Sequence, residues 1–232
     1  MWKVKVFTLY PELFPGPLNS GLYKKALDKK IWSLQVINIR EYAKDKHKTV
    51  DDTPFGGGSG MVMRADVLAD CLDKNILNKE ESTIYLSPKG KKFDHNCSKN
   101  IANKNLNIIC GHFEGVDERL LETRNIKQIS LGDYILSGGE IAAFVIIDSV
   151  VRLLPKVLGN PDSLLEESFE KHLLEYPQYT KPQKWEGKEV PNVLLSGDHK
   201  KIKDWRLTKS GDITRARRAD LWKKYKEKNE KH

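Results

Sequence analysis

The sequence has few cysteines, and their spacing excludes two classes of protein. Among 232 residues there are three, Cys71, Cys97 and Cys110, and no two of them form a CxxC pair. An odd number of widely spaced cysteines supports neither a disulfide framework nor a zinc site. We therefore expect the protein to work in a reducing compartment.

Long apolar runs are also lacking. The longest unbroken one, IAAFVII at residues 141–147, is too short to span a bilayer. The N-terminal stretch MWKVKVFTL alternates apolar and polar residues as a β-strand does, and it does not contain the apolar core of a signal peptide. These features predict a cytoplasmic protein with no membrane partner.

Several common catalytic and nucleotide-binding motifs are missing. The six histidines show no metal-ligand spacing, and no Ser-His-Asp order with a nucleophile elbow occurs. No Lys-Ser/Thr follows the glycine cluster at residues 56–60, and the cluster fits no GxGxxG frame. Hydrolysis by a triad or by zinc is therefore disfavoured, and the known phosphate-binding fingerprints do not apply.

The net positive charge is confined to one end of the chain. Residues 199–232 carry 13 basic and 5 acidic side chains, whereas residues 1–198 carry 27 of each. No continuous apolar face accompanies the basic end, so nucleic acid fits it better as a partner than a membrane does. A solvated basic tail without a partner is the alternative.

Short apolar runs alternate with helix-like stretches over the first two thirds of the chain. Strands are predicted at 2–9, 34–39, 83–88, 107–111 and 127–132, and helices near 18–30, 63–74, 92–105, 117–124 and 140–154. This order predicts an α/β fold with a mostly parallel sheet and helices on both faces.

The alternation ends after Gly159, where we expect a change of domain. Two basic helices near 199–208 and 215–230 predict a small, mainly helical C-terminal domain. We expect the main domain to cover residues 1–159, a linker 160–172, and the basic domain 173–232. Aromatic residues in the basic part are suited to stacking on RNA bases, although each is equally consistent with a small core.

Three loops rich in glycine, serine or proline directly follow predicted strands. They are YLSPKG (85–90), ICGHFEGVDER (109–119) and SLGDYILSGGE (130–140). Carboxyl ends of parallel strands share one edge of a sheet, so these loops predict a single pocket built mainly from backbone. Such a pocket favours an uncharged, nucleoside-like ligand.

Two further stretches have both a functional and an ordinary interpretation. DDTPFGGGSGMVM (51–63) is as consistent with a flexible surface turn as with a loop that wraps a ligand. The predicted helix at 140–154 is apolar almost all round, which indicates a core helix or a subunit contact. Glu140, Asp148 and Arg152 share one stripe of it, and an ordinary Asp148–Arg152 pair is the alternative to a catalytic role.

Taken together, six ordered blocks resemble the bacterial tRNA (guanine-N1-)-methyltransferases of the TrmD type, which belong to the knotted SPOUT class. Besides the four stretches quoted above, they are ESFEKHLLEYPQYTKP, and VPNVLLSGDHKKIKDWR with RARRADL. The resemblance covers nearly the whole chain. It implies a trefoil knot in the N-terminal domain, a homodimer with active sites between subunits, and methylation of N1 of guanosine 37 next to the tRNA anticodon.

The resemblance also implies roles for individual residues. S-adenosyl-L-methionine would be bound by Tyr85, Leu86, Ser87, Pro88, Gly111, Leu131, Gly132, Asp133, Tyr134, Ile135, Leu136, Gly138 and Gly139. The catalytic set would contain Glu114, Arg152 and Glu167. The target guanine would be received by His47, Asp51, Gly56, Gly57, Gly58 and Gly60, and the C-terminal domain would grip the anticodon arm of the tRNA. The family is linked with Mg²⁺ dependence, but no ligand cluster in the sequence identifies a metal site.

The chain departs from the family pattern at the expected general base. The family has an aspartate before Ser-Phe, whereas this chain has Glu167 before Ser168 and Phe169. His112 stands where the family often has an arginine, so this position lacks the fixed positive charge that an arginine would supply. Two alternatives stay open: a knotted RNA-binding protein with weak catalysis, or a SPOUT methyltransferase that acts on another RNA.

Overall fold

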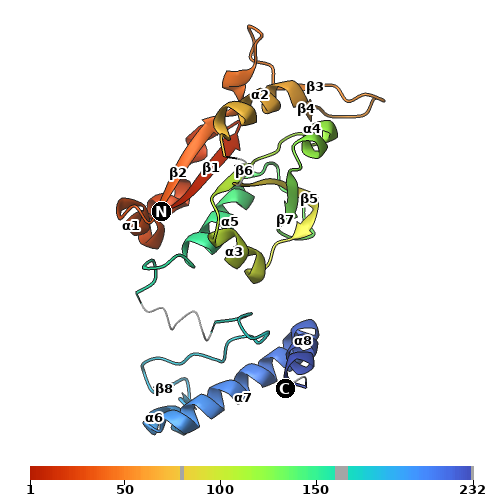
Figure 1. Cartoon of the computed structure of the whole chain (residues 1–232). Helices are drawn as coiled ribbons and strands as arrows, with labels where there is room; N and C mark the ends of the chain where they lie inside the picture. Colours follow the sequence, from red (N-terminus) through yellow and green to blue (C-terminus); the bar gives the residue numbers. More distant parts are fainter. Residues whose placement is uncertain (79–80, 160–166, 231–232) are drawn as a thin grey trace. The chain divides into compact units, whose positions relative to one another are not determined.

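A computed structural model describes residues 1–78, 81–159 and 167–230 (Figure 1). The chain divides into two compact units, Met1–Gly159 and Asn160–His232. Of the expected linker over 160–172, residues 160–166 lie outside the described residues.

A five-stranded parallel sheet forms the centre of the first unit. Its strands are β1 (Trp2–Thr8), β2 (Trp32–Asn38), β5 (Ser82–Lys92), β6 (Leu106–Ile109) and β7 (Lys127–Ser130). They lie in the order β2-β1-β6-β5-β7, and every adjacent pair is parallel. The predicted α/β class and mostly parallel sheet are therefore confirmed, with strand ends shifted by a few residues.

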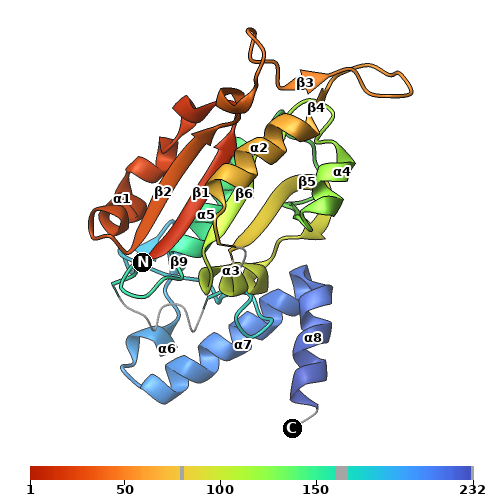
Figure 2. The same ribbon diagram turned by 45° about the horizontal axis from the view of Figure 1, so that its top comes forward.

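Helices cover both faces of this sheet because its strands bury side chains on both sides. On one face α1 (Gly21–Asp28), α3 (His95–Ala102) and α5 (Glu140–Val151) pack in the core that contains Val4 and Val6. On the other, α2 (Ala65–Asn75) and α4 (Glu118–Thr123) pack in the core that contains Phe7. Figure 2 shows α2 in front of the strands and α5 behind them.

The predicted helices exist, but several are shorter than expected. The stretch 18–30 was wrong as one helix: a 3-10 turn, η2 (Gly16–Asn19), precedes α1, and Gly21, the first residue of α1, has φ +56°. Near 92–105 the helix begins only after Asp94, whose carboxylate accepts a hydrogen bond from the Cys97 N–H at 2.8 Å. The remaining short elements are η1 (Pro11–Leu13), η3 (Ile39–Tyr42), β3 (Asp51–Asp52) and β4 (Val62–Met63).

Strand β5 contains a bulge where it passes β7. Leu86 and Lys91 both pair with Ile129, so the intervening residues 87–90 leave the ladder. Gly90 lies so close to β7 that a Cβ on it would be 2.6 Å from the Ile129 carbonyl carbon and closer still to the Ile129 nitrogen. Only glycine permits this contact between two main chains.

In the described part of the second unit, residues 167–230, there are three helices and a small hairpin. The helices are α6 (Asn192–Leu195), α7 (His199–Arg217) and α8 (Ala219–Asn229), and the hairpin joins β8 (Lys184–Trp185) to β9 (Lys188–Glu189). The Asp198 carboxylate caps α7 by accepting the Lys201 N–H at 3.1 Å. The first predicted basic helix is thus longer than expected, since it ends at Arg217 rather than near 208.

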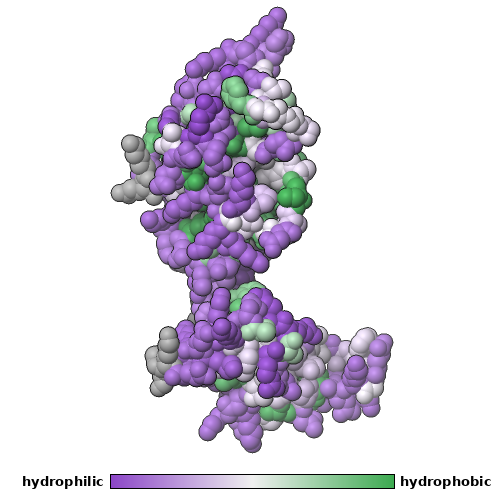
Figure 3. Space-filling view, turned by 90° about the vertical axis from the view of Figure 1, so that its right-hand side faces the viewer, coloured by the Kyte–Doolittle hydropathy of each residue, from purple (hydrophilic) through white to green (hydrophobic). Residues whose placement is uncertain are grey.

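Few apolar side chains hold this unit together. Leu173 and Leu221 are buried, and the buried Thr214 hydroxyl accepts the Leu174 N–H at 2.7 Å. The Arg206 guanidinium lies 4.8 Å from the Tyr176 ring centre. Hydrophilic side chains cover much of the surface seen in Figure 3. Among the helices of the described residues, none is long and apolar enough to cross a membrane.

Candidate active site

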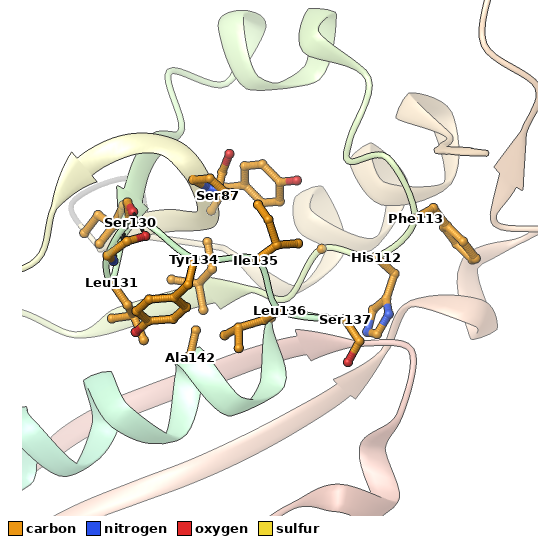
Figure 4. A pocket seen from close by; sticks show the side chains of 18 residues that line it. Ser87, His112, Phe113, Ser130, Leu131, Tyr134, Ile135, Leu136, Ser137 and Ala142 are labelled. Atoms are coloured by element: carbon orange, nitrogen blue, oxygen red, sulfur yellow. Dashed lines mark hydrogen bonds between the residues drawn. The ribbon is translucent and has the colours of Figure 1, made fainter. Parts of the chain in front are cut away.

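A pocket lies beside the bulge of β5 and the carboxyl ends of β6 and β7 (Figure 4). Its lining consists of Tyr85, Leu86, Ser87, Pro88, Gly111, His112, Phe113, Ile129, Ser130, Leu131, Gly132, Tyr134, Ile135, Leu136, Ser137, Gly138, Gly139 and Ala142. All residues that the sequence predicts for the cofactor are present except Asp133. The structure thus brings together segments that lie about 50 residues apart in the chain, although binding itself stays a prediction.

Close contact between main chains shapes the pocket. The Gly139 N–H donates to the Gly111 carbonyl oxygen at 3.0 Å. A Cβ on Gly139 would lie 2.6 Å from the Cys110 Cα, and one on Gly111 would lie 2.5 Å from the Tyr85 ring. Side chains at these two positions would push the segments apart, so the glycines are needed for packing.

The lining suits an uncharged, nucleoside-like part of a ligand. Its polar groups are mainly main-chain amides and hydroxyls, such as those of Ser87 and Ser137, and Leu86, Ile135 and Leu136 supply apolar surface. Among the lining residues, which all belong to the described part, there is no Asp, Glu, Lys or Arg. Burial raises the pKa of the Tyr85 phenol, with a hydrogen bond to the Val116 backbone acting in the opposite direction.

Beside the pocket, a glycine-rich hairpin joins the loop that follows β6. Strands β3 and β4 are antiparallel, and the Met63 N–H donates to the Gly115 carbonyl at 2.8 Å. The Glu114 N–H donates to the Met61 carbonyl at 2.9 Å. A Cβ on Gly60 would collide with the Glu114 side chain, so the expected guanine loop and Glu114 are in contact. Glu114 directly follows three residues of the pocket lining.

The tip of this hairpin is held open by backbone conformation rather than by packing. Gly56, Gly57 and Gly58 have φ of +88°, +78° and +131°, and no atom lies within 4 Å of a Cβ built on any of them. Residues other than glycine rarely adopt such φ angles. The neighbouring Phe55 is 99% exposed. The structure therefore presents an aromatic ring and bare main chain to solvent.

Comparison with known proteins identifies the family. The family described as "tRNA (Guanine-1)-methyltransferase TrmD" matches residues 2–224. The chain belongs to this family.

Similar curated proteins cover nearly the whole chain. One from Pelagibacter ubique (strain HTCC1062) is 67% identical over 228 residues, 97% of this chain and 99% of that one. One from Wolbachia pipientis wMel is 52% identical and covers 95% of each chain. One from Bartonella tribocorum (strain CIP 105476 / IBS 506) is 51% identical and covers 99% of each. All three carry the name tRNA (guanine-N(1)-)-methyltransferase.

Of the three catalytic residues implied by the TrmD resemblance, Glu114 and Arg152 belong to the first unit, and neither lines this pocket. Arg152 follows the last turn of α5, whereas Glu140 begins the helix beside the pocket. At about 1.5 Å per residue, the two are about 18 Å apart along the helix axis. Glu167 belongs to the second unit, so the structure does not test whether it reaches the pocket. Its role as general base stays a prediction.

A tyrosine fixes the helix turn that precedes Arg152. The Tyr23 phenol is hydrogen-bonded to the Asp148 carboxylate, which together with burial raises the pKa of Tyr23 to about 12, while the Arg152 charge opposes the shift. The Arg152 N–H donates to the Asp148 carbonyl at 3.2 Å. Asp148 is therefore shared with α1 and is more than a simple helix partner of Arg152.

The remaining predicted substrate residues lie on the surface near the hairpin. His47 is exposed, and its main-chain N–H donates to the Asp45 carboxylate at 2.9 Å. Asp51 lies in β3 opposite Met63. No group of three or more His, Cys, Asp or Glu in the described residues is arranged to hold a metal ion. The predicted Mg²⁺ dependence therefore has no candidate site in this part of the chain.

Sequence reasoning missed several lining residues of the pocket. They are His112, Phe113, Ile129, Ser130, Ser137 and Ala142. In the structure Phe113 is distinguished by its φ of +59°, which is unusual for an aromatic residue. His112 stood out in the sequence as a departure from the family pattern, but its partners were not evident.

Proposed function

We propose that this protein transfers a methyl group from S-adenosyl-L-methionine to N1 of guanosine 37 of tRNA. The neutral, glycine-shaped pocket supports the proposal, and so does membership of the TrmD family over residues 2–224. We also propose that it acts in the cytosol, where tRNA would be available; its three free cysteines support a reducing compartment.

The pocket residues would hold the methyl donor mainly through the main chain. The 85–88 segment, Gly111 and the 131–139 segment would contact the adenosine and the amino-acid arm. When bound, the donor supplies an electrophilic methyl group on a sulfonium ion. The same segments would shield the methyl group from water.

The acceptor requires a base, because N1 of neutral guanine carries a proton and is a poor nucleophile. In this proposal the Glu167 carboxylate removes that proton as N1 is methylated. The Arg152 guanidinium stabilises the negative charge that develops at O6. Glu114 and the adjacent hairpin receive the flipped base, with the exposed glycine main chain leaving room for it.

The active site is proposed to lie between the two subunits of a homodimer. Arg152 is about 18 Å along α5 from the pocket end, so one protomer does not bring both together. The same helix exposes Ile141 (59%) and Val145 (44%), although its other sides are buried. An apolar helix exposed in this way is typical of a subunit contact.

The dimer has a direct test. Val145→Asp is expected to shift the protein from dimer to monomer in analytical ultracentrifugation and to abolish methyl transfer. The matched variant Thr123→Asp, on the surface of α4, is expected to remain dimeric. A monomeric wild-type protein with full activity would disprove the shared site.

We further propose that the first unit contains a trefoil knot. Its crossing would be formed by β5, β7 and the segment that leads into α5. Its support is the contact of Gly90 with Ile129 and of Gly139 with Cys110, where main chains pass without room for a Cβ. The 160–172 segment would be the linker and 173–232 the tRNA-binding domain. Exposed Trp185 (63%) and Tyr179 (47%) among basic residues suit contact with the anticodon arm.

The decisive experiment is to map the methyl group after reaction with unmodified tRNA that carries guanosine at position 37. We expect incorporation at N1 of that nucleotide and none when adenosine replaces it. Tight tRNA binding without incorporation would indicate the RNA-binding alternative. Methylation at another site or in another RNA would indicate a different SPOUT specificity.

A further inference from the structure

A buried carboxylate beside the pocket links three segments that are distant in the sequence. Glu140, at the start of α5, is 4% exposed, and its Oε1 accepts the Thr8 hydroxyl at 2.5 Å. Both of its carboxylate oxygens lie 2.9 Å from Nε2 of His112. Nε2 is thus the ring nitrogen that faces the carboxylate. Thr8 ends β1 and is fully buried.

The His112 ring is enclosed on its other sides as well. The Tyr10 ring centre lies 4.9 Å from it, and the Tyr10 N–H donates to the Thr8 hydroxyl oxygen at 2.9 Å. A Cβ on Gly138 would lie 2.6 Å from Nε2 of His112 and 2.7 Å from Oε2 of Glu140. In Figure 4 the imidazole points toward Ser137, at one end of the pocket. Tyr10 and Glu140, which lie outside the donor-binding segments, therefore help to set its orientation.

This chain of contacts controls the position of one pocket wall. His112 belongs to the loop that carries Gly111 on one side and Phe113 and Glu114 on the other. The Gly111 carbonyl also accepts the Gly139 N–H, so the loop is fastened to the start of α5 by a main-chain bond and by the His112–Glu140 pair. A buried carboxylate that loses a donor draws water or moves its neighbours, which disturbs this wall.

We propose that His112 is a positioning residue for the methyl donor, acting through Glu140 and Thr8. The Thr8–Glu140–His112 chain holds loop 111–114 in the shape that the donor requires. This inference rests on the proposed function, because it assigns the pocket to S-adenosylmethionine. It concerns residues that the family resemblance did not include in the donor site.

Thr8 provides the sharpest test because it does not line the pocket and cannot touch the donor. Thr8→Val removes one hydrogen bond to Glu140, and we expect about three- to tenfold weaker donor binding by isothermal titration calorimetry. His112→Ala is expected to weaken it about tenfold or more. His112→Arg, which also offers donors to both carboxylate oxygens, is expected to stay within about threefold of wild type.

The double variant Thr8→Val/His112→Ala separates a linked chain from two independent structural defects. If the three residues act as a unit, the double variant binds the donor no more weakly than His112→Ala alone. Thr83→Val is the matched control. It removes a hydroxyl that accepts a hydrogen bond from Asn107 at 3.3 Å and that lies outside the pocket lining, so donor affinity is expected to be unchanged.

The outcomes distinguish a failure of this inference from a failure of the proposed function. Wild-type donor affinity in Thr8→Val, or fully additive losses in the double variant, would overturn the positioning role. Weakening by Thr83→Val equal to that by Thr8→Val would also overturn it, since general destabilisation would then explain both. A wild-type protein that takes up no donor would instead refute the proposed function itself. Because binding is measured without tRNA, the result does not depend on Glu167 or on catalysis.

Discussion

Replacing Gly90 by alanine is expected to destabilise the first unit by about 3 kcal/mol. The added methyl would lie 2.6 Å from the Ile129 carbonyl carbon, whereas ordinary contacts lie at 3.4–4 Å. The atoms in its way are main-chain atoms of β7, which is paired with β5 on both sides of the bulge. Overpacking costs about 1–3 kcal/mol, and a rigid obstacle places this substitution at the upper end.

Differential scanning calorimetry provides the measurement. For a unit of this size, about 3 kcal/mol corresponds to a fall in Tm of about 6–12 °C. Gly159→Ala is the matched control, because nothing lies within 4 Å of its Cβ and its φ is not in the left-handed region. We expect the control to be unchanged or slightly more stable. A Gly90→Ala protein whose Tm lies within about 2 °C of wild type would refute the crossing of main chains as described.

Three other predictions concern catalysis, the glycine hairpin and the cysteines. Glu167→Gln is expected to lower kcat at least about 100-fold with tRNA affinity unchanged, whereas Glu167→Asp should retain most activity, both measured by single-turnover methyl transfer. A Glu167→Gln protein with normal activity would show that Glu167 is not the general base. Gly57 has φ +78°, which costs an alanine about 1–2 kcal/mol, so Gly57→Ala should change the shape of this exposed loop. The KM for tRNA should therefore rise without a large change in Tm, and an unchanged KM would exclude the hairpin from substrate binding. Burial raises the pKa of Cys71 to about 12 and that of Cys110 well above its ordinary value, so both thiols stay protonated at pH 8. A thiol-reactive dye should therefore label only Cys97 rapidly until the protein is unfolded, and fast native labelling of all three would contradict the burial.

The sequence predicts the elements of this fold better than their arrangement. The five strands of the main sheet were located, whereas β3, β4, β8 and β9 were not predicted. The order β2-β1-β6-β5-β7 depends on pairings between distant segments. The end of β5 was missed because Pro88 and Gly90 indicate a break. The ladder resumes beyond them at Lys91, once the bulge has carried the chain past Ile129.

The candidate site, like the fold, could be predicted only in part from the sequence. Loops after strands were enough to predict a pocket, because parallel strands direct their carboxyl ends to one edge. The role of Glu140 was not predictable, since its partners His112 and Thr8 are 28 and 132 residues away in the sequence. A carboxylate in an apolar helix was visible in the sequence, but only the folded chain reveals which donors satisfy it.

A cleft lined largely by peptide groups limits how this protein can change. An inhibitor that copied the nucleoside would be held by amides and carbonyls, which most point substitutions leave in place. Escape would then require altering glycines such as Gly111 or Gly139, where a larger residue collides with the chain itself. Reduced sensitivity and reduced folding stability would therefore arise from the same substitution.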